Sequence, residues 1–240
     1  MTVPNSMRRG PGGFGLSGRV PLAALAMLLT GCASTVTGHP VGSEPNTVAQ
    51  HVAAQLSTLL PDPAQFPAEY EAVVLPAEAA AQAAGDLTGV GRGSTVRPDG
   101  CAPPAQQFGP NQTAIAVGTD NRTRATMTVE LTRTGQPLSA LRDQLKRCRQ
   151  VHVSRAGTTT TVTTELQAPP PTDADDTLAL RRTVAPQVSA AGLRQSMQTL
   201  TGQIADVRIT VTYMTFGDAK PDAAALDELF ATAVRKVEKG

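Results

Sequence analysis

The feature that most limits how this chain can fold is a strict alternation of apolar and polar residues in two stretches. Residues 125–132 place Ala, Met, Val and Leu at every second position, with Thr and Glu between them. Residues 207–214 repeat the pattern with Val, Ile, Val and Tyr. Successive side chains of a strand point to opposite faces of a sheet, so each stretch predicts a β-strand with one buried face.

The other predicted elements are shorter or less regular. Further strands are predicted at residues 71–75, 113–118, 151–153, 158–166 and 177–184. Helices are predicted at residues 46–60, 76–84, 137–148, 189–202 and 221–237, and a long Gly- and Pro-rich loop at 85–111. Because the strands are mostly consecutive, short and amphipathic, we expect an α+β fold. In it, an antiparallel sheet packs against helices on one face, as a two-layer sandwich.

The segment Leu29-Thr30-Gly31-Cys32 resembles a bacterial lipobox. It follows a basic stretch with Arg8, Arg9 and Arg19 and an apolar run at residues 20–29, which is too short to span about 30 Å of hydrocarbon. Residues 1–31 are therefore predicted to be a lipoprotein signal peptide, with either Met1 or Met7 as the true start. Cys32 would become the lipid-bearing N-terminus, with an S-diacylglycerol and an N-acyl group.

The part after Cys32 divides into a tether and a domain. Residues 32–45 are rich in Pro, Gly, Ser and Thr and predict a flexible tether. Residues 46–240 are predicted to form one α+β domain, which is enough chain for a sizeable core. We expect the protein at the extracytoplasmic face of the cell membrane, held by the lipids on Cys32.

The charge and aromatic content argue against a nucleic-acid partner. Aromatic residues make up only 3% of the chain, and there is no Trp to stack on bases. Without the three signal-peptide arginines, 18 of the 21 basic residues remain against 20 acidic ones, a net charge of −2. A weakly acidic domain lacks the electrostatic basis for binding phosphate backbones.

Two cysteines remain once Cys32 is assigned to the lipobox. Cys101 and Cys148 are an even pair in a compartment that permits disulfides, so we predict that they are bonded. Closing a loop of this length stabilises the fold by about 4 kcal/mol in the chain-entropy model. The alternative is a pair of buried free thiols.

Three patterns were weighed as sites of chemistry. The Gly-rich segment 88–94 lacks the strand, helix and lysine of a phosphate-binding loop. The acidic cluster Asp173, Asp175 and Asp176 lacks the spacing of a calcium loop, and His152 has no nucleophile in a recognisable motif. We therefore predict no catalytic residues, no metal site and no cofactor.

Several scattered motifs together resemble a family. They are Leu59-Leu60-Pro61, Phe66-Pro67, residues 98–103, Cys148 between a helix and a strand pair, residues 205–211, and Leu229-Phe230. With these, the chain resembles mycobacterial-type envelope lipoproteins related to the extracellular sensor domain of the serine/threonine kinase PknH. It departs from that domain in having one cysteine pair instead of two and no kinase. The resemblance implies an α+β fold with a ligand cleft and a sensing or binding role, and it supplies no catalytic residues.

These observations predict a lipid-anchored envelope protein that is not an enzyme. Its domain would bind an unidentified small molecule, lipid or protein, in a cleft between the sheet and the 85–111 loop. The alternative is a carrier of lipid or glycolipid with an apolar cavity. A weaker alternative is an envelope hydrolase.

Overall fold

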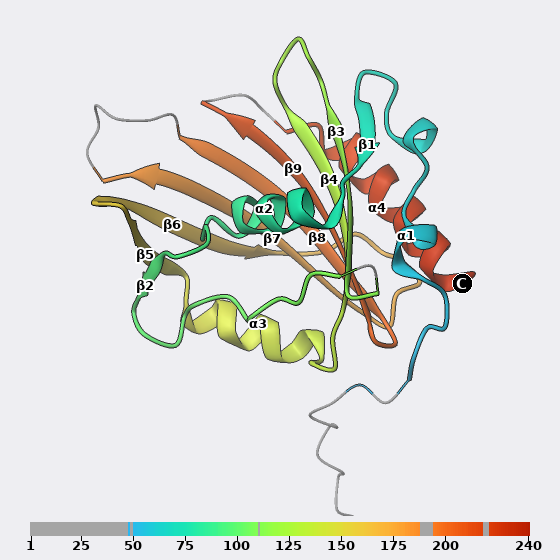
Figure 1. Cartoon of the computed structure of the whole chain (residues 1–240), viewed down its shortest axis with the longest axis horizontal. Helices are drawn as coiled ribbons and strands as arrows, with labels where there is room; N and C mark the ends of the chain where they lie inside the picture. The colour runs from blue at the N-terminus through green and yellow to red at the C-terminus, as the bar shows by residue number, and fades with distance from the viewer. Residues whose placement is uncertain (1–47, 49, 110, 188–193, 218–220) are drawn as a thin grey trace, which may run out of the picture. The chain divides into compact units, whose positions relative to one another are not determined.

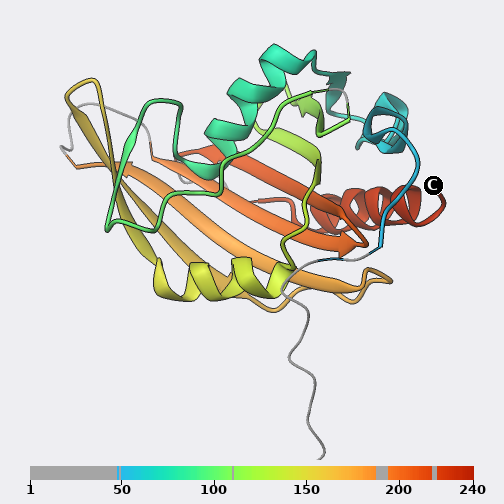
Figure 2. The same cartoon turned by 60° about the horizontal axis from the view of Figure 1, so that its bottom comes forward.

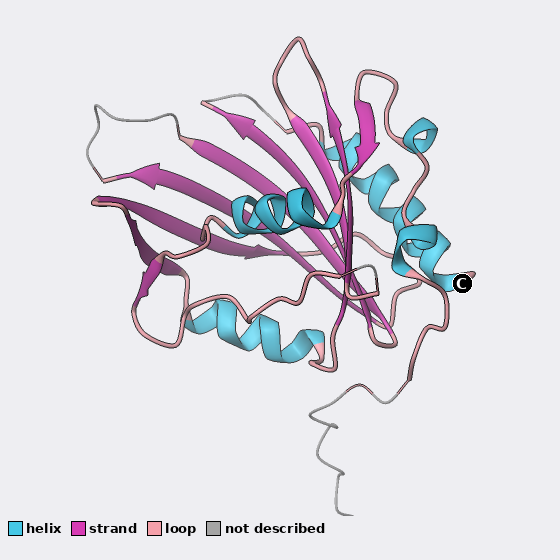
Figure 3. Cartoon of the chain, viewed as in Figure 1, coloured by secondary structure: helices cyan, strands magenta, loops and turns pink. Residues whose placement is uncertain are grey.

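The computed structural model describes residues 48, 50–109, 111–187, 194–217 and 221–240. Within these residues, nine strands form one antiparallel sheet, and helices pack against it (Figure 3). The predicted α+β class, with an antiparallel sheet packed against helices, is therefore confirmed. The strands are β1 (Glu71–Val74), β2 (Thr95–Arg97), β3 (Thr113–Thr119), β4 (Thr126–Arg133), β5 (Gln150–Arg155), β6 (Thr158–Gln167), β7 (Asp176–Pro186), β8 (Gln195–Ile204) and β9 (Val207–Phe216). The helices are α1 (Leu56–Leu59), α2 (Ala77–Thr88), α3 (Leu138–Arg147) and α4 (Ala223–Glu238), with a short 3-10 helix, η1 (Pro63–Gln65).

The two alternating stretches of the sequence lie side by side within the sheet. Its strand order is β1-β3-β4-β9-β8-β7-β6-β5-β2, and β4 pairs with β9 across a long separation in sequence. Val129 lies opposite Val211 in this register. The apolar side chains of both strands therefore point to the same face.

That face carries the main core. Met127, Ile209 and their alternate neighbours are fully buried against helix α4, which contributes Leu226 and Phe230. Each such side chain contributes roughly 1.5–3 kcal/mol when it leaves water. The apolar layer between β4, β9 and α4 is thus the principal source of stability.

Helices α2 and α3 lie on the opposite face, which corrects the expectation that all helices lie on one face. Ile115 of β3 packs against α2, and Leu178 of β7 packs against α3, whereas the adjacent Ala114 and Ala179 belong to the main core. Adjacent residues of a strand point to opposite faces. Figure 1 shows α2 in front of the strands and α4 behind them.

The helix predicted at 189–202 is wrong over its described part, because residues 195–204 form strand β8. Met197 and Leu200 fit helical spacing, but they lie on opposite faces of the sheet and both are buried. A strand that is covered on both faces does not show an apolar and polar alternation. Because both faces of β8 are buried, its apolar residues happen to match helical spacing.

The helix predicted at 46–60 is also wrong over most of its length. Only α1 is helical among the described residues of this segment, and residues 50–55 have no regular structure. The amide of Val52 donates to Asp206 at 2.9 Å, and that of Val48 donates to the carbonyl of Gly135 at 2.9 Å. Contacts with distant residues therefore replace the intrahelical hydrogen bonds.

Other predicted elements are close to the observed ones. The helix predicted at 76–84 continues through Gly85 to Thr88 and ends at Gly89, which has a left-handed φ of 71°. The predicted signal peptide and tether lie outside the described residues, as does the start of the 189–202 segment. In the described part of the chain, no helix is long and apolar enough to cross a membrane.

Candidate functional site

A cavity of about 380 Å³ lies on the face that carries α2 and α3. It is enclosed by strands β4 and β6 to β9, by α3, and by the segment between β2 and β3. Figures 1 and 2 show this segment, in green, running over the sheet between α2 and α3. The cavity is therefore where the sequence analysis expects a cleft, between the sheet and the 85–111 loop.

The floor of the cavity is a set of threonine side chains from neighbouring strands. The members that line it are Thr132, Thr164, Thr199, Thr201 and Thr210. We call this set the threonine floor. The register explains its formation, because Thr201 of β8 lies opposite Thr210 of β9, which lies opposite Glu130 of β4. A row of hydroxyl groups can both donate and accept hydrogen bonds.

The opposite wall is mainly apolar and is held by the disulfide between Cys101 and Cys148. Leu141 and Leu145 of α3 line this wall together with Pro103. The Gln144 side chain also donates to the carbonyl of Ala102 at 2.9 Å. The predicted disulfide thus ties the long loop to the end of α3 and closes one side of the cavity.

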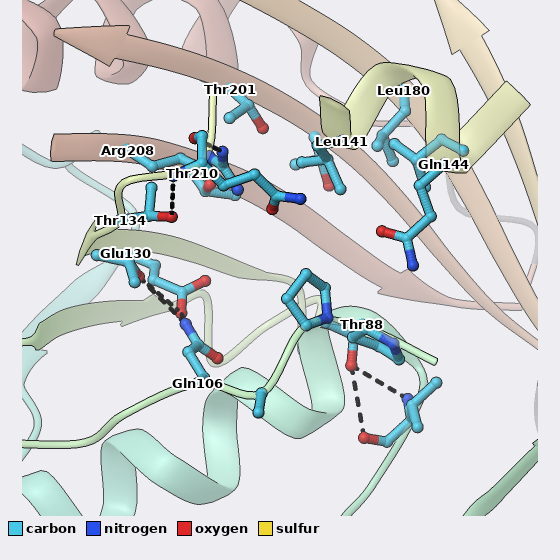
Figure 4. Close-up of a pocket in the computed structure, with 18 of the residues that line it drawn as sticks. Thr88, Gln106, Glu130, Thr134, Leu141, Gln144, Leu180, Thr201, Arg208 and Thr210 are labelled. Carbon is cyan, nitrogen blue, oxygen red and sulfur yellow. Dashed lines mark hydrogen bonds between the residues drawn. The ribbon is translucent and has the colours of Figure 1, made fainter. Parts of the chain in front are cut away.

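Glu130 and Arg208 form a charged group at one end. The Gln106 side chain donates to Glu130, and these two side chains point toward one another in Figure 4. Burial raises the pKa of Glu130, although Gln106, Thr132 and the positive charge of Arg208 act in the opposite direction. Arg208 donates to the carbonyl of Gln136 at 2.7 Å, and its Nε is buried without a hydrogen-bond partner.

Arg182 lines the cavity at the other end. It lies opposite Met197 on β8, whereas Arg208 lies opposite Gln203, so six residues, about 20 Å along the strand, separate their positions. Its Nη1 donates to the carbonyl of Leu87 at 2.8 Å and its Nε to Thr164 Oγ1 at 3.4 Å. In the described part of the chain, no acidic side chain forms an ion pair with it.

Arg133 lines the rim and has a partner. Asp206 accepts from its Nη1 at 2.9 Å, from the Val52 amide at 2.9 Å, and lies 2.6 Å from His51 Nδ1. Burial alone would raise the pKa of Asp206, but these hydrogen bonds and the Arg133 charge outweigh it and lower the pKa below its usual value. This ion pair holds the segment before α1 against the β8–β9 turn.

A family model matches residues 62–237 of the chain, and its description is Domain of unknown function (DUF5642). The chain belongs to the DUF5642 family. No curated protein matches it.

Two similar solved structures come from mycobacteria. An uncharacterised protein (Rv0999 ortholog) from Mycobacterium smegmatis is 19% identical with a TM-score of 0.44, covering 72% of this chain and 92% of that one. The extracellular domain of PknH from Mycobacterium tuberculosis is 13% identical with a TM-score of 0.42, covering 75% of this chain and 98% of that one. The second of them is the sensor domain named in the resemblance that the sequence motifs carry.

Of the other patterns from the sequence, the Gly-rich segment contributes Thr88 and Val90 to the cavity lining of this DUF5642 domain, whereas His152 and the acidic cluster are not lining residues. His152 on β5 contacts Thr161 of β6 and Gln187, which follows β7. Asp176 pairs with Arg142 at 2.6 Å, and Asp175 accepts from the Ala205 amide at 2.9 Å. Among the described residues, no group of three His, Cys, Asp or Glu side chains could hold a metal ion.

Sequence reasoning did not single out the charged residues of the cavity. Glu130 and Arg208 were assigned to the polar faces of their strands, without a ligand role. Arg182 lies in a predicted strand beside Arg181 and carries no motif. The sequence feature that could have identified them is a charged residue between threonines on one face of a strand. Where a loop covers that face, the charged side chain becomes buried.

Proposed function

We propose that this domain is an exported, lipid-anchored and non-enzymatic module that binds a small ligand in the cavity above the threonine floor. The observation that carries the proposal is the cavity, with its volume of about 380 Å³, its apolar wall and its hydroxyl-bearing floor. Ligand sites in proteins are typically pockets of about 300–1,000 Å³ with mainly apolar walls and a few placed polar groups. The lipid anchor is inferred from the lipobox and Cys32.

The chemistry of the lining supports binding rather than catalysis. The described lining residues include no Ser, His or Lys, and the two cysteines are joined to each other. A nucleophile beside a general base is the usual requirement for a hydrolase. Threonine hydroxyls and arginines can hold a ligand without reacting with it.

The polar floor is less suited to the alternative of a lipid carrier. An acyl chain would leave the Thr201 hydroxyl and the three unused N–H groups of Arg182 without polar partners. Each buried polar group in that condition costs roughly 1–3 kcal/mol. A polar ligand avoids this cost.

The test is native mass spectrometry of the full-length protein purified in detergent from its own membranes. We expect a retained small molecule, which Ala105→Trp displaces, because Ala105 is exposed and lines the cavity. The matched control is Ala224→Trp, since Ala224 is exposed on α4, on the opposite face of the sheet. Absence of any retained molecule, or equal retention in the two variants, contradicts the proposal.

A further inference from the structure

The three arginines that line the cavity differ in whether an acidic side chain lies near them. Arg133 is paired with Asp206, and Arg208 shares its end of the cavity with Glu130. Arg182 is the remaining lining cation, and in the described part of the chain no acidic side chain forms an ion pair with it. Glu130 is the one carboxylate among the described lining residues, so the Arg182 end of the cavity has none.

The hydrogen bonds of Arg182 leave much of its guanidinium free. A guanidinium has five N–H groups, and the described contacts use two of them, to Leu87 and Thr164. Leu87 belongs to the last turn of α2, whose carbonyl end carries about half a negative charge. That partial charge offsets only part of the guanidinium charge. Three N–H groups remain for a ligand.

Burial makes the unpaired charge costly. The side chain is half-buried and contacts the end of α2, and burial lowers the pKa of Arg182 to about 10. It therefore stays protonated at neutral pH. Removing a charge from water without a partner is unfavourable, and an anion in the cavity would supply the missing partner.

We propose that the Arg182 end of the cavity binds the oxyanion group of a small ligand, a carboxylate or a phosphate, with the rest of the ligand along the threonine floor. This inference rests on the proposed binding function and names its ligand class. A planar guanidinium can donate two parallel hydrogen bonds to either group. Thr164, which also lines the cavity, lies directly opposite Arg182 on β6.

Calorimetric titration of the full-length protein in detergent tests the inference. The probes are sulfate and inorganic phosphate in one arm, and acetate and succinate in the other. We expect saturable binding in at least one arm, weakened by about tenfold or more in Arg182→Met, because charge-assisted hydrogen bonds are lost. The arm with the tighter binding identifies the oxyanion.

The matched control is Arg181→Met. Arg181 is the adjacent residue of β7, is exposed and points to the other face of the sheet. The affinity of the Arg181→Met variant for the probe should stay within about twofold of that of the wild type. No saturable binding up to about 10 mM, or equal binding in Arg182→Met, overturns the inference.

Because Arg182→Met also removes the contact with α2, Ala105→Trp provides a second variant. It narrows the cavity and leaves Arg182 in place. Loss of oxyanion binding in Ala105→Trp supports the inference, and unchanged binding overturns it. A neutral molecule retained in mass spectrometry without any oxyanion binding overturns this inference alone and leaves the proposed function standing.

Discussion

Single charged residues of this domain differ in the direction in which folding shifts their pKa. Asp206 is held by Arg133, His51 and a backbone amide, which lower its pKa. Burial raises the pKa of Glu130, although the positive charge of Arg208 opposes this shift. The two carboxylates should therefore change the stability of the protein in opposite directions as the pH rises.

For Asp206→Asn we expect a loss of about 1–3 kcal/mol in unfolding free energy at pH 7, because Arg133 loses its partner. The pKa of Asp206 is lowered on folding, so its contribution is present above the unfolded pKa and is lost as the pH falls through the folded pKa. Urea unfolding of both proteins should show the gap closing in acid. A gap that is independent of pH contradicts the prediction.

Asp62→Asn is the control for that measurement. Asp62 pairs with Lys236 at 2.8 Å, but its side chain is 71% exposed. Solvent screens an exposed ion pair, so it contributes little to stability. The effect should therefore be clearly smaller than that of Asp206→Asn.

Glu130→Gln should change stability in the opposite sense. Burial raises the pKa of Glu130 on folding, so the wild type loses stability as the pH rises from the unfolded pKa through the folded pKa. The glutamine variant lacks this titration and keeps an oxygen that can accept from Gln106. Urea unfolding should show that the stability of the variant increases relative to the wild type as the pH rises above about 4. If the unfolding free energy of the variant instead falls relative to that of the wild type as the pH rises, the prediction is refuted.

Among the elements, β3 depends on a close approach. A Cβ at Gly118 would lie 2.8 Å from Phe66 Cδ1 and 2.9 Å from the Tyr70 Cβ, so the turn before β1 packs directly onto this strand. We expect Gly118→Ala to lower the unfolding free energy by about 1–3 kcal/mol through overpacking. Gly135→Ala is the control, because nothing lies within 4 Å of its Cβ position. Equal stability of the two variants in urea unfolding would contradict this reading.

The disulfide is the covalent link between the long loop and α3. Thiol titration of the unfolded, unreduced mature protein should find no free cysteine, since Cys101 and Cys148 are bonded and Cys32 is expected to be lipidated. Reduction should lower the unfolding free energy by about 4 kcal/mol, because the unfolded chain regains the entropy of the closed loop. Two titratable thiols would disprove the bridge in the isolated protein.

For the whole molecule, the proposed lipid anchor on Cys32 would determine where the domain works. The lipid groups on Cys32 would bury acyl chains worth about 0.8 kcal/mol per CH₂, enough for stable attachment when several chains are present. Cys32→Ser should therefore move the protein from the membrane fraction to the soluble or unprocessed pool. Immunoblots of fractionated cells measure this, and an unchanged membrane fraction would refute the anchor.

Local sequence patterns correctly predicted the elements that pack against the core with one face. The alternation of β4 and β9 and the amphipathic periods of α3 and α4 are visible in the sequence, because each of these elements has one side against the core. β8 was predicted as a helix, because both of its faces are covered and periodicity then carries no signal. The helix prediction for the segment before α1 was wrong for a related reason, because the Val52 amide donates to Asp206, which is far away in sequence.

By itself, the sequence determined the α+β class, the strongly periodic elements, the cysteine pairing and the general place of the cavity. These follow from side-chain period, from cysteine count and from the length of a Gly- and Pro-rich loop. Only the tertiary structure decided that the helices cover both faces and that, among the described residues, no acidic side chain forms an ion pair with the half-buried Arg182. The physical reason is that burial and ion pairing depend on which distant segments meet, and in this domain the loop after β2 covers the threonine floor of β4, β6, β8 and β9.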